Sequence, residues 1–267
     1  MIKLVCTDID GTIFKPDYTF SEPLRNCIKE LLRKGVKVVL VTGRMHSVAQ
    51  CIADDLGLET PVVSFQGGMI VQNGNIVYEK NLPSQVVGEI IDWAKERNAQ
   101  LNFYREGVMY VEDENSAVKR YSKDPYTKYV IKPFKTLPHT RVNKLLALNF
   151  EDAELVSSWR DELAQKYPDL YIVKSTPYYC EVSNKEASKY CAVKFLQELW
   201  GISEAETLCI GDQDNDIKLL EAGGVKVAMG NASEGLKSVA DFITDDIHND
   251  GFVKAMEKFV LGVKEDV

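Results

Sequence analysis

The sequence lacks long apolar runs and clusters of basic residues. Its longest apolar stretches, such as VVLV at 38–41, are strand-sized, and its start, MIKLVCTD, has no signal-like basic and apolar segments. The 32 lysines and arginines are scattered and stand against 40 acidic residues, for a net charge of −8. We therefore expect a cytoplasmic protein that binds neither a nucleic-acid backbone nor a membrane.

The sequence also lacks closely spaced cysteines, repeats and low-complexity tracts. None of its six cysteines lies in a CxxC pair, so buried reduced thiols are favoured over disulfides or a thiolate metal site. The hydrophobic and charged fractions, 45% and 27%, are those of an ordinary globular protein. A chain of 267 residues is long enough for one large or two moderate domains.

Apolar strands and amphipathic helices alternate at both ends of the chain. Strands are predicted at 2–8, 36–43 and 61–67, with helices between them, and Ser21 and Gly35 are expected to bound the first helix. The same alternation returns after residue 185. Strands that are apolar at nearly every position indicate a doubly wound α/β fold, with a parallel sheet covered on both faces.

The middle of the chain has a different pattern of predicted helices and strands. Asn73-Gly74 predicts a hairpin that leads out of the first domain, and residues 84–184 then read as an α+β domain with a mainly antiparallel sheet. Its second helix, at 151–168, is expected to bury Leu155, Trp159 and Leu163. We predict a discontinuous core domain, 1–83 and 185–267, with an inserted domain at 84–184.

Acidic residues follow several of the predicted core strands. Asp8 and Asp10 follow the first strand, and Asp212 and Asp216 follow a later one. Ligands of doubly wound sheets lie beyond the carboxyl ends of the strands, where four carboxylates would repel one another unless a cation held them. All-oxygen ligands fit Mg²⁺. A calcium loop in DQDND is excluded, because Ile217 stands where such a loop needs glycine.

Four motifs occur in a fixed order along the chain. They are DIDGT at 8–12, VTGR at 41–44, Lys189 in ASKYCAV, and GDQDND at 211–216. Together they resemble the haloacid dehalogenase (HAD) superfamily of phosphatases. The insertion between the second and third motifs, with VAMGNA at 227–232 and DGF at 250–252, is similar to the Cof-type sugar phosphatases, which carry a class IIB cap.

The resemblance implies a Mg²⁺-dependent phosphatase that acts on a small phosphorylated metabolite. A sugar phosphate is the first candidate substrate. Asp8 would be the nucleophile that forms an aspartyl-phosphate, and Asp10 the general acid and base. Asp8, Asp10, Asp212 and Asp216 would hold the metal. The phosphate-binding residues implied are Ile9, Thr42, Gly43, Lys189 and Asn215. We expect a monomer or a weak homo-oligomer.

The inserted domain would be a lid that excludes water and reads the leaving group. Candidate specificity residues are Arg44, Arg105, His139, Arg141, Tyr178, Tyr179 and Glu181. The chain departs from the family pattern at Gln66-Gly67-Gly68 and at Tyr190, where relatives commonly have Asn-Gly-Ala and a glycine. These departures bear on the substrate and leave the catalytic groups in place.

Two other readings share the same acidic pocket. A phosphomutase of the same superfamily would return the phosphoryl group to a second hydroxyl of the product. A receiver module of a signalling system would keep it on Asp8, but it needs neither Asp10 nor an insertion of this size.

Overall fold

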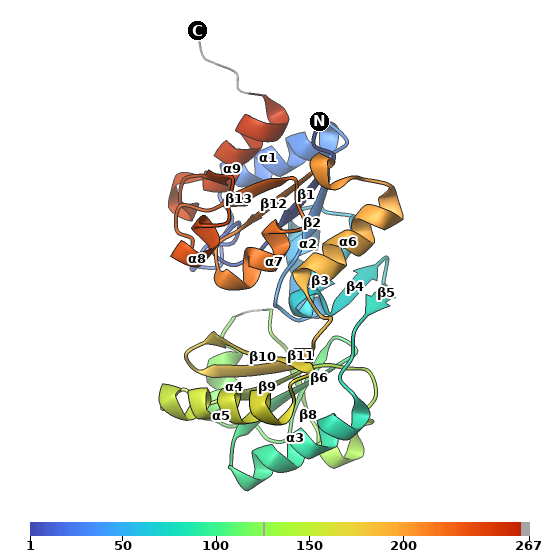
Figure 1. Ribbon diagram of the computed structural model, residues 1–267, viewed down its shortest axis with the longest axis vertical. Helices are drawn as coiled ribbons and strands as arrows, with labels where there is room; N and C mark the ends of the chain where they lie inside the picture. The colour runs from blue at the N-terminus through green and yellow to red at the C-terminus, as the bar shows by residue number, and fades with distance from the viewer. Residues whose placement is uncertain (125, 263–267) are drawn as a thin grey trace.

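A five-stranded parallel sheet forms the core of the molecule (Figure 1). The computed structural model describes residues 1–124 and 126–262. The strand order is β14-β13-β12-β1-β2, and all neighbours are parallel. The strands are β1 (Leu4–Thr7), β2 (Lys37–Leu40), β12 (Thr207–Gly211), β13 (Val225–Ala228) and β14 (Phe242–Ile243). A parallel bridge between Val41 and Val63 attaches β3 (Val62–Ser64) beside β2.

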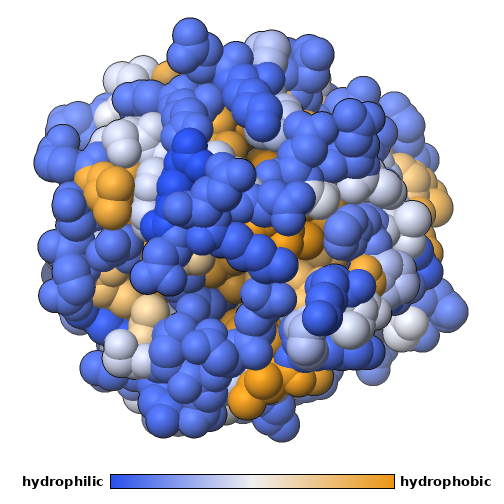
Figure 2. Space-filling view, turned by 90° about the horizontal axis from the view of Figure 1, so that it is seen from below, coloured by the Kyte–Doolittle hydropathy of each residue, from blue (hydrophilic) through white to orange (hydrophobic). Residues whose placement is uncertain are grey.

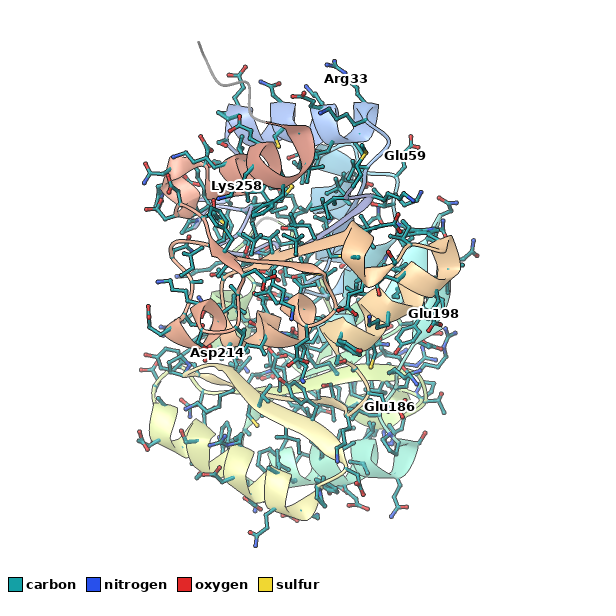
Figure 3. The ribbon with its side chains drawn as sticks, turned by 45° about the horizontal axis from the view of Figure 1, so that its top comes forward. Arg33, Glu59, Glu186, Glu198, Asp214 and Lys258 are labelled. Atoms are coloured by element: carbon teal, nitrogen blue, oxygen red, sulfur yellow. The ribbon has the colours of Figure 1, made fainter. Side chains whose placement is uncertain are left out.

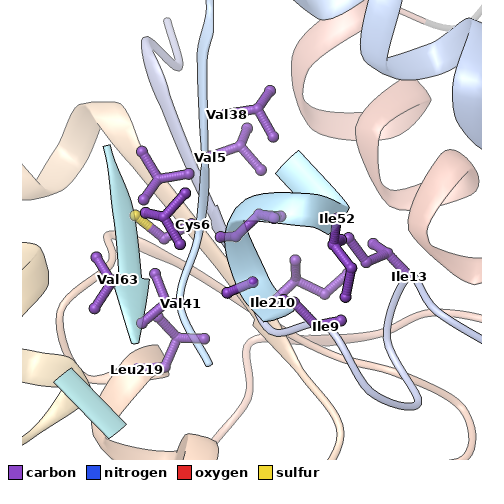
Figure 4. Packing of buried hydrophobic residues seen from close by; sticks show 14 of the residues in the cluster. Val5, Cys6, Ile9, Ile13, Val38, Val41, Ile52, Val63, Ile210 and Leu219 are labelled. Atoms are coloured by element: carbon purple, nitrogen blue, oxygen red, sulfur yellow. The ribbon is translucent and has the colours of Figure 1, made fainter. Parts of the chain in front are cut away.

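Helices cover both faces of this sheet, as the apolar strands predicted. Every residue of β1 and β12 is buried, and successive strand residues face opposite sides, so neither face is open to solvent. Figure 4 shows Val5, Val38 and Ile210 packed within this core. The helices are α1 (Glu22–Arg33), α2 (His46–Asp55), α6 (Lys189–Trp200), α7 (Ile217–Leu220), α8 (Glu234–Lys237) and α9 (Gly251–Met256).

The first helix ends where the sequence places its boundaries. Ser21 is the N-cap of α1, and its hydroxyl accepts a hydrogen bond from the Leu24 amide at 3.2 Å. Gly35, with φ +74°, follows the C-cap and turns the chain toward β2. Short 3₁₀ segments and one π segment complete the described part; they are Phe65–Gly67, Phe134–Thr136, Glu204–Glu206, Asp214–Asp216, Ile247–Asn249 and the π turn Glu257–Leu261.

A hairpin leads from the core into the insertion. β4 (Met69–Gln72) and β5 (Asn75–Glu79) pair antiparallel, and β4 also pairs with β3. Asn73 and Gly74 both have positive φ, 51° and 75°, which is the backbone of a tight type I′ turn. The hairpin predicted from Asn73-Gly74 is confirmed.

A six-stranded sheet of order β10-β11-β9-β6-β7-β8 forms the inserted part. All pairs are antiparallel except β7 with β8, which is parallel. The strands are β6 (Gln100–Arg105), β7 (Val108–Val111), β8 (Tyr129–Ile131), β9 (Val142–Leu148), β10 (Leu170–Thr176) and β11 (Tyr179–Asn184). The helices are α3 (Ser84–Glu96), α4 (Ser116–Tyr121) and α5 (Ala153–Lys166). We call residues 84–184 the cap.

The cap sheet is covered on both faces. On the outer face α3 and α5 pack together, with the rings of Trp93 and Trp159 edge to face at 5.8 Å. On the inner face Tyr104 and Leu146 belong to the same apolar cluster as the parallel-sheet core. The prediction for α5 is wrong at one position: Leu155 is exposed, because the buried stripe of this helix runs through Val156, Trp159 and Leu163.

Two neighbouring segments connect the cap with the core. The side-chain amide of Asn184 donates to the Asn81 carbonyl at 2.8 Å, and the Leu82 amide donates to the Val142 carbonyl at 2.8 Å. An ion pair joins Lys80 to Glu186. The outgoing and returning strands of the chain therefore run side by side at the junction.

The outer surface of the cap is largely hydrophilic. Seen from below, it shows charged and polar side chains with small apolar patches between them (Figure 2). None of the helices in the described part of the chain combines the length and the apolar character needed to cross a bilayer.

Candidate active site

The carboxyl ends of the central strands meet at one edge of the parallel sheet. Thr7 at the end of β1 lies in register with Leu40 of β2 and Ile210 of β12. Asp8, Thr42 and Asp212 follow these ends and are all buried. Gly11 lets the backbone approach them: its φ is +75°, and a Cβ there would lie 2.2 Å from a carboxylate oxygen of Asp212.

Lys189 lies at the centre of the acidic residues. Ser188 caps α6, so Lys189 is the first residue of that helix, and its side chain is only 1% exposed. Its Nζ donates to Asp8 Oδ1 at 2.6 Å and to Asp216 Oδ1 at 2.5 Å. Burial disfavours the ammonium, but the two carboxylates outweigh it and raise the pKa of Lys189.

Three buried carboxylates lie close together here, and two of them, Asp8 and Asp216, contact Lys189. Asp8, Asp212 and Asp216 can bring one oxygen each within 4.8 Å of one another. Burial raises the pKa of Asp8 well above its ordinary value, and it raises the pKa of Asp212 to about 6. Three carboxylates this close together, with oxygen as the donor atom, fit a divalent hard cation such as Mg²⁺.

Asp216 is the most fully engaged of the three. Besides Lys189, it accepts hydrogen bonds on Oδ2 from the amides of Asp212, at 3.0 Å, and Gln213, at 3.2 Å. Asp212 accepts from Gln213 Nε2 at 3.0 Å and from Thr12 Oγ1 at 3.4 Å. Both oxygens of Asp216 are thus held by an ammonium and two backbone amides, whereas Asp8 and Asp212 could each turn an oxygen toward a metal.

Asp10 has a different partner from Asp8. β1 ends at Thr7, and the Asp10 side chain lies outside the buried cluster, 54% exposed. Arg44 clamps it with two hydrogen bonds, from Nε at 2.7 Å and from Nη2 at 2.6 Å. Burial opposes the charge on Arg44, but the hydrogen bonds and charge of Asp10 outweigh it and raise the pKa of Arg44.

The loop after β2 lies beside the acidic cluster. Thr42 Oγ1 accepts from the Arg44 amide at 3.1 Å. At Gly43 a Cβ would lie 2.4 Å from the Gln66 side chain, so a larger residue would displace that side chain. Gln66 in turn accepts from Asn215 Nδ2 at 3.2 Å. The Ile9 side chain is buried in the core, so only its backbone can face a ligand.

A cavity of about 500 Å³ lies between this edge and the inner face of the cap. Asp214, labelled in Figure 3, marks its position at the junction of the two sheets. Most of the lining comes from the second and fourth motifs and from β10 and β11. The lining residues are Asp8, Asp10, Thr42, Gly43, Arg44, Gln66, Tyr121, Lys144, Lys174, Ser175, Thr176, Tyr179, Glu181, Asp212, Gln213, Asp214 and Asn215.

Of the cap residues that the sequence analysis names as specificity candidates, some line the cavity and others lie away from it. Tyr179 and Glu181 line the cavity. Arg105 instead bonds Thr140 and Glu106, and Tyr178 packs on the ring of Phe150 at 6.0 Å. Neither belongs to the described lining of the cavity, and the same holds for two further residues. These are His139, which lies against Gly88, and Arg141, which pairs with Glu79 and Glu106.

Several lining residues were not singled out in the cap sequence. The largest omission is Lys144, which is 4% exposed and pairs with Glu181 at 3.2 Å. Tyr121 and the run Lys174, Ser175 and Thr176 are the others. A lysine on a strand ordinarily indicates a solvated position, and the burial of this one depends on its tertiary contacts with Glu181 and Gly43.

Residues 5–256 match the haloacid dehalogenase-like hydrolase family. The chain belongs to this family. A member from Bacteroides thetaiotaomicron has a TM-score of 0.89 and 26% identity, and the match covers 97% of this chain and 99% of that one. The HAD subclass IIB sugar phosphatase BT4131 has the same fold, with a TM-score of 0.83 and 22% identity over 96% of this chain and 98% of that one.

A relative of known name is similar over nearly the whole chain. The 5-amino-6-(5-phospho-D-ribitylamino)uracil phosphatase YcsE of Bacillus subtilis is 29% identical, and the match covers 97% of this chain and 96% of that protein. The family assignment from the four motifs is confirmed, and the chain is a HAD phosphatase of the Cof type with a doubly wound core.

Proposed function

We propose that this HAD phosphatase is a Mg²⁺-dependent phosphomonoesterase of the cytoplasm that forms an aspartyl-phosphate on Asp8. Its substrates are small phosphorylated metabolites, and sugar phosphates are the first candidates. One observation carries the proposal. A buried carboxylate, held by Lys189 at the carboxyl end of β1, faces a cavity that is closed on its other side by the cap. Residues 84–184 act as the cap domain of this enzyme.

In the first step an oxygen of Asp8 attacks phosphorus, and the bond from phosphorus to the leaving oxygen breaks. Asp10 gives its proton to that oxygen, so the product leaves as an alcohol. In the second step Asp10 takes a proton from a water that attacks the phosphorus, which frees Asp8 and releases inorganic phosphate. Both carboxylate oxygens of Asp10 accept hydrogen bonds from Arg44, so Asp10 must release at least one of these bonds before that oxygen can exchange a proton with the substrate.

The charge of the phosphoryl group would be stabilised by groups at the ends of the strands. Lys189 supplies a positive charge, and Thr42, Asn215 and the backbone amides of Ile9 and Gly43 supply hydrogen-bond donors. Mg²⁺, held by Asp8, Asp212 and the Asp10 carbonyl, would neutralise further charge on the phosphoryl oxygens. Asp216 would act through Lys189 and the backbone.

The chemistry of the cavity wall supports a hydroxylated leaving group. Glu181 offers carboxylate oxygens, and Tyr121, Ser175 and Tyr179 carry hydroxyls. These groups include both donors and acceptors, and the hydroxyls of a sugar or polyol can bond to either kind. YcsE, a 5-amino-6-(5-phospho-D-ribitylamino)uracil phosphatase, is named for a substrate with a phosphorylated ribityl group, which supports the same class.

The test is the removal of the nucleophile. Asp8→Asn keeps the size of the side chain, and we expect it to lower turnover of p-nitrophenyl phosphate by about 10³-fold or more. Asp55→Asn, at an exposed carboxylate that pairs with Arg25, is the matched control and should retain wild-type turnover. Activity of Asp8→Asn within tenfold of wild type would overturn the assignment of Asp8.

A further inference from the structure

Lys144 is a buried cation that the cap presents to the catalytic edge of the core. It lies on β9, is 4% exposed, and lines the cavity. Its Nζ donates to Glu181 Oε2 at 3.2 Å and to the Gly43 carbonyl at 3.4 Å. The side chain thus reaches from the cap to the loop that follows β2.

The cap holds this ammonium in place from several sides. Glu181 lies on the adjacent strand, and its other carboxylate oxygen accepts from Ser175 Oγ at 2.6 Å. The ring of Tyr104 lies under the ammonium, with its centroid 5.0 Å from Nζ. Burial disfavours the charge, but Glu181 outweighs it and raises the pKa of Lys144, so the side chain stays an ammonium.

The carbonyl that Lys144 contacts belongs to the peptide between Gly43 and Arg44. The N–H of that same peptide is the Arg44 amide, which donates to Thr42 Oγ1 at 3.1 Å. One peptide is therefore bound on both sides, its oxygen by the cap and its N–H by the core. It connects the Gly43 amide with the Arg44 side chain that clamps Asp10.

We propose that Lys144 is a positioning residue that the cap supplies to the loop after β2, which carries Thr42, Gly43 and Arg44. Its ammonium fixes the peptide between Gly43 and Arg44, so that the loop is fully oriented for a phosphoryl group only while the cap lies against the core. This inference rests on the proposed function of the loop. It differs from a role in reading the leaving group, because it predicts the same loss for every phosphate ester.

The experiment compares Lys144→Met with Lys174→Met. Lys174 is also a cap lysine that lines the cavity, but its ammonium bonds Ser157 Oγ at 2.6 Å and the Ala153 carbonyl, inside the cap. Calorimetry would give the Kd of inorganic phosphate with Mg²⁺ present. Steady-state assays would give kcat/KM for p-nitrophenyl phosphate and for a hexose phosphate.

We expect Lys144→Met to weaken phosphate binding by about tenfold or more and to lower both kcat/KM values by similar factors. Lys174→Met should change the phosphate Kd by less than about twofold. Equal Kd values for the two variants would overturn the proposal. A loss confined to the hexose phosphate would also overturn it, since Lys144 would then contact the leaving group.

Two further variants guard against a folding defect. Lys144→Arg keeps a cationic donor and should recover part of the phosphate affinity. Glu181→Gln leaves Lys144 in place without its ion pair and should weaken phosphate binding by less than Lys144→Met, with no added loss in the double variant. If wild type bound phosphate but turned over no ester, the proposed function would fail, and the Kd comparison would still decide the role of Lys144.

Discussion

Lys189 is the residue on which the acidic edge of the parallel sheet depends. It is almost fully buried and contacts two buried carboxylates, Asp8 and Asp216. Burying charges costs free energy that only close, well-aligned partners offset. Removing Lys189 takes the ammonium away from both carboxylates, so we expect the stability of the fold to depend on this side chain.

The first prediction at this scale concerns Lys189→Met. Because the change removes the ammonium partner of two buried carboxylates, we expect the free energy of unfolding in the absence of Mg²⁺ to fall by about 3–5 kcal/mol, as measured by urea denaturation. Lys194→Met is the control on the same helix. Its ion pair with Glu204 is partly exposed, and its loss should cost less than about 1 kcal/mol. Similar losses for the two variants would contradict this account.

The sequence predicts residues well where chemistry follows a strand end. Asp8, Thr42 and Asp212 were placed together because the ends of parallel strands share one edge, and the structure brings them to that edge. Lys144 was missed because its burial depends on Glu181, which is 37 residues away in the chain. The Asp10–Arg44 clamp was missed for the same reason: a hydrogen bond between two loops has no periodicity.

At the scale of elements, the strands β9, β10 and β11 form the cap side of the cavity, opposite the edge of the parallel sheet that carries Asp8 and Asp212. The turn between β10 and β11 puts consecutive tyrosines in different places. Tyr179 lines the cavity and packs edge to face on Tyr121 at 5.5 Å, whereas Tyr178 packs on Phe150. Burial raises the pKa of Tyr179 to about 12, so its hydroxyl stays protonated as a donor.

The prediction at this scale is that Tyr179→Phe changes the ranking of substrates. Loss of one donor should lower kcat/KM for a hexose phosphate by about tenfold and change that for p-nitrophenyl phosphate much less, because the aryl group has no hydroxyl to bind. Tyr178→Phe removes the neighbouring hydroxyl outside the cavity and should leave the ranking as in wild type. A uniform loss across substrates with Tyr179→Phe would contradict a role in selectivity.

Elements with local signals were predictable, and those that depend on tertiary packing were not. The hairpin at Asn73-Gly74 and the ends of α1 follow from turn and cap residues. The short helix α4 and the strand β8 were not predicted, because they are six and three residues long. In β8 the residues Val130 and Ile131 are exposed, so no alternation marks the strand.

At the scale of the whole molecule, the acidic cluster links stability to pH. Burial raises the pKa of Asp212 from 3.8 to about 6 and raises that of Asp8 as well. A carboxyl whose pKa is higher in the folded state stabilises the fold when it is protonated. That contribution is complete below pH 3.8 and is lost as the pH rises through about 6.

We therefore expect the metal-free protein to lose thermal stability relative to Asp212→Asn as the pH rises from about 4 to about 7. The shift in pKa corresponds to a free energy on the order of 3 kcal/mol. Added Mg²⁺ should raise the Tm of wild type at pH 7.5 more than at pH 5, where protons compete, and should barely affect Asp212→Asn. EDTA should abolish phosphatase activity. A Tm that changes with neither pH nor Mg²⁺ would contradict the proposal that this site binds a metal.

The paired connection between core and cap has a consequence for how the molecule moves. Two adjacent segments, tied by Asn184 to Asn81 and by Lys80 to Glu186, restrict the cap more than one flexible tether would. We expect two adjacent connections of this kind to allow mainly one rotation of the cap relative to the core. We expect cap movement to be confined to this rotation, so that each closure would return Lys144 to the Gly43 carbonyl and each opening would clear the same route for the product.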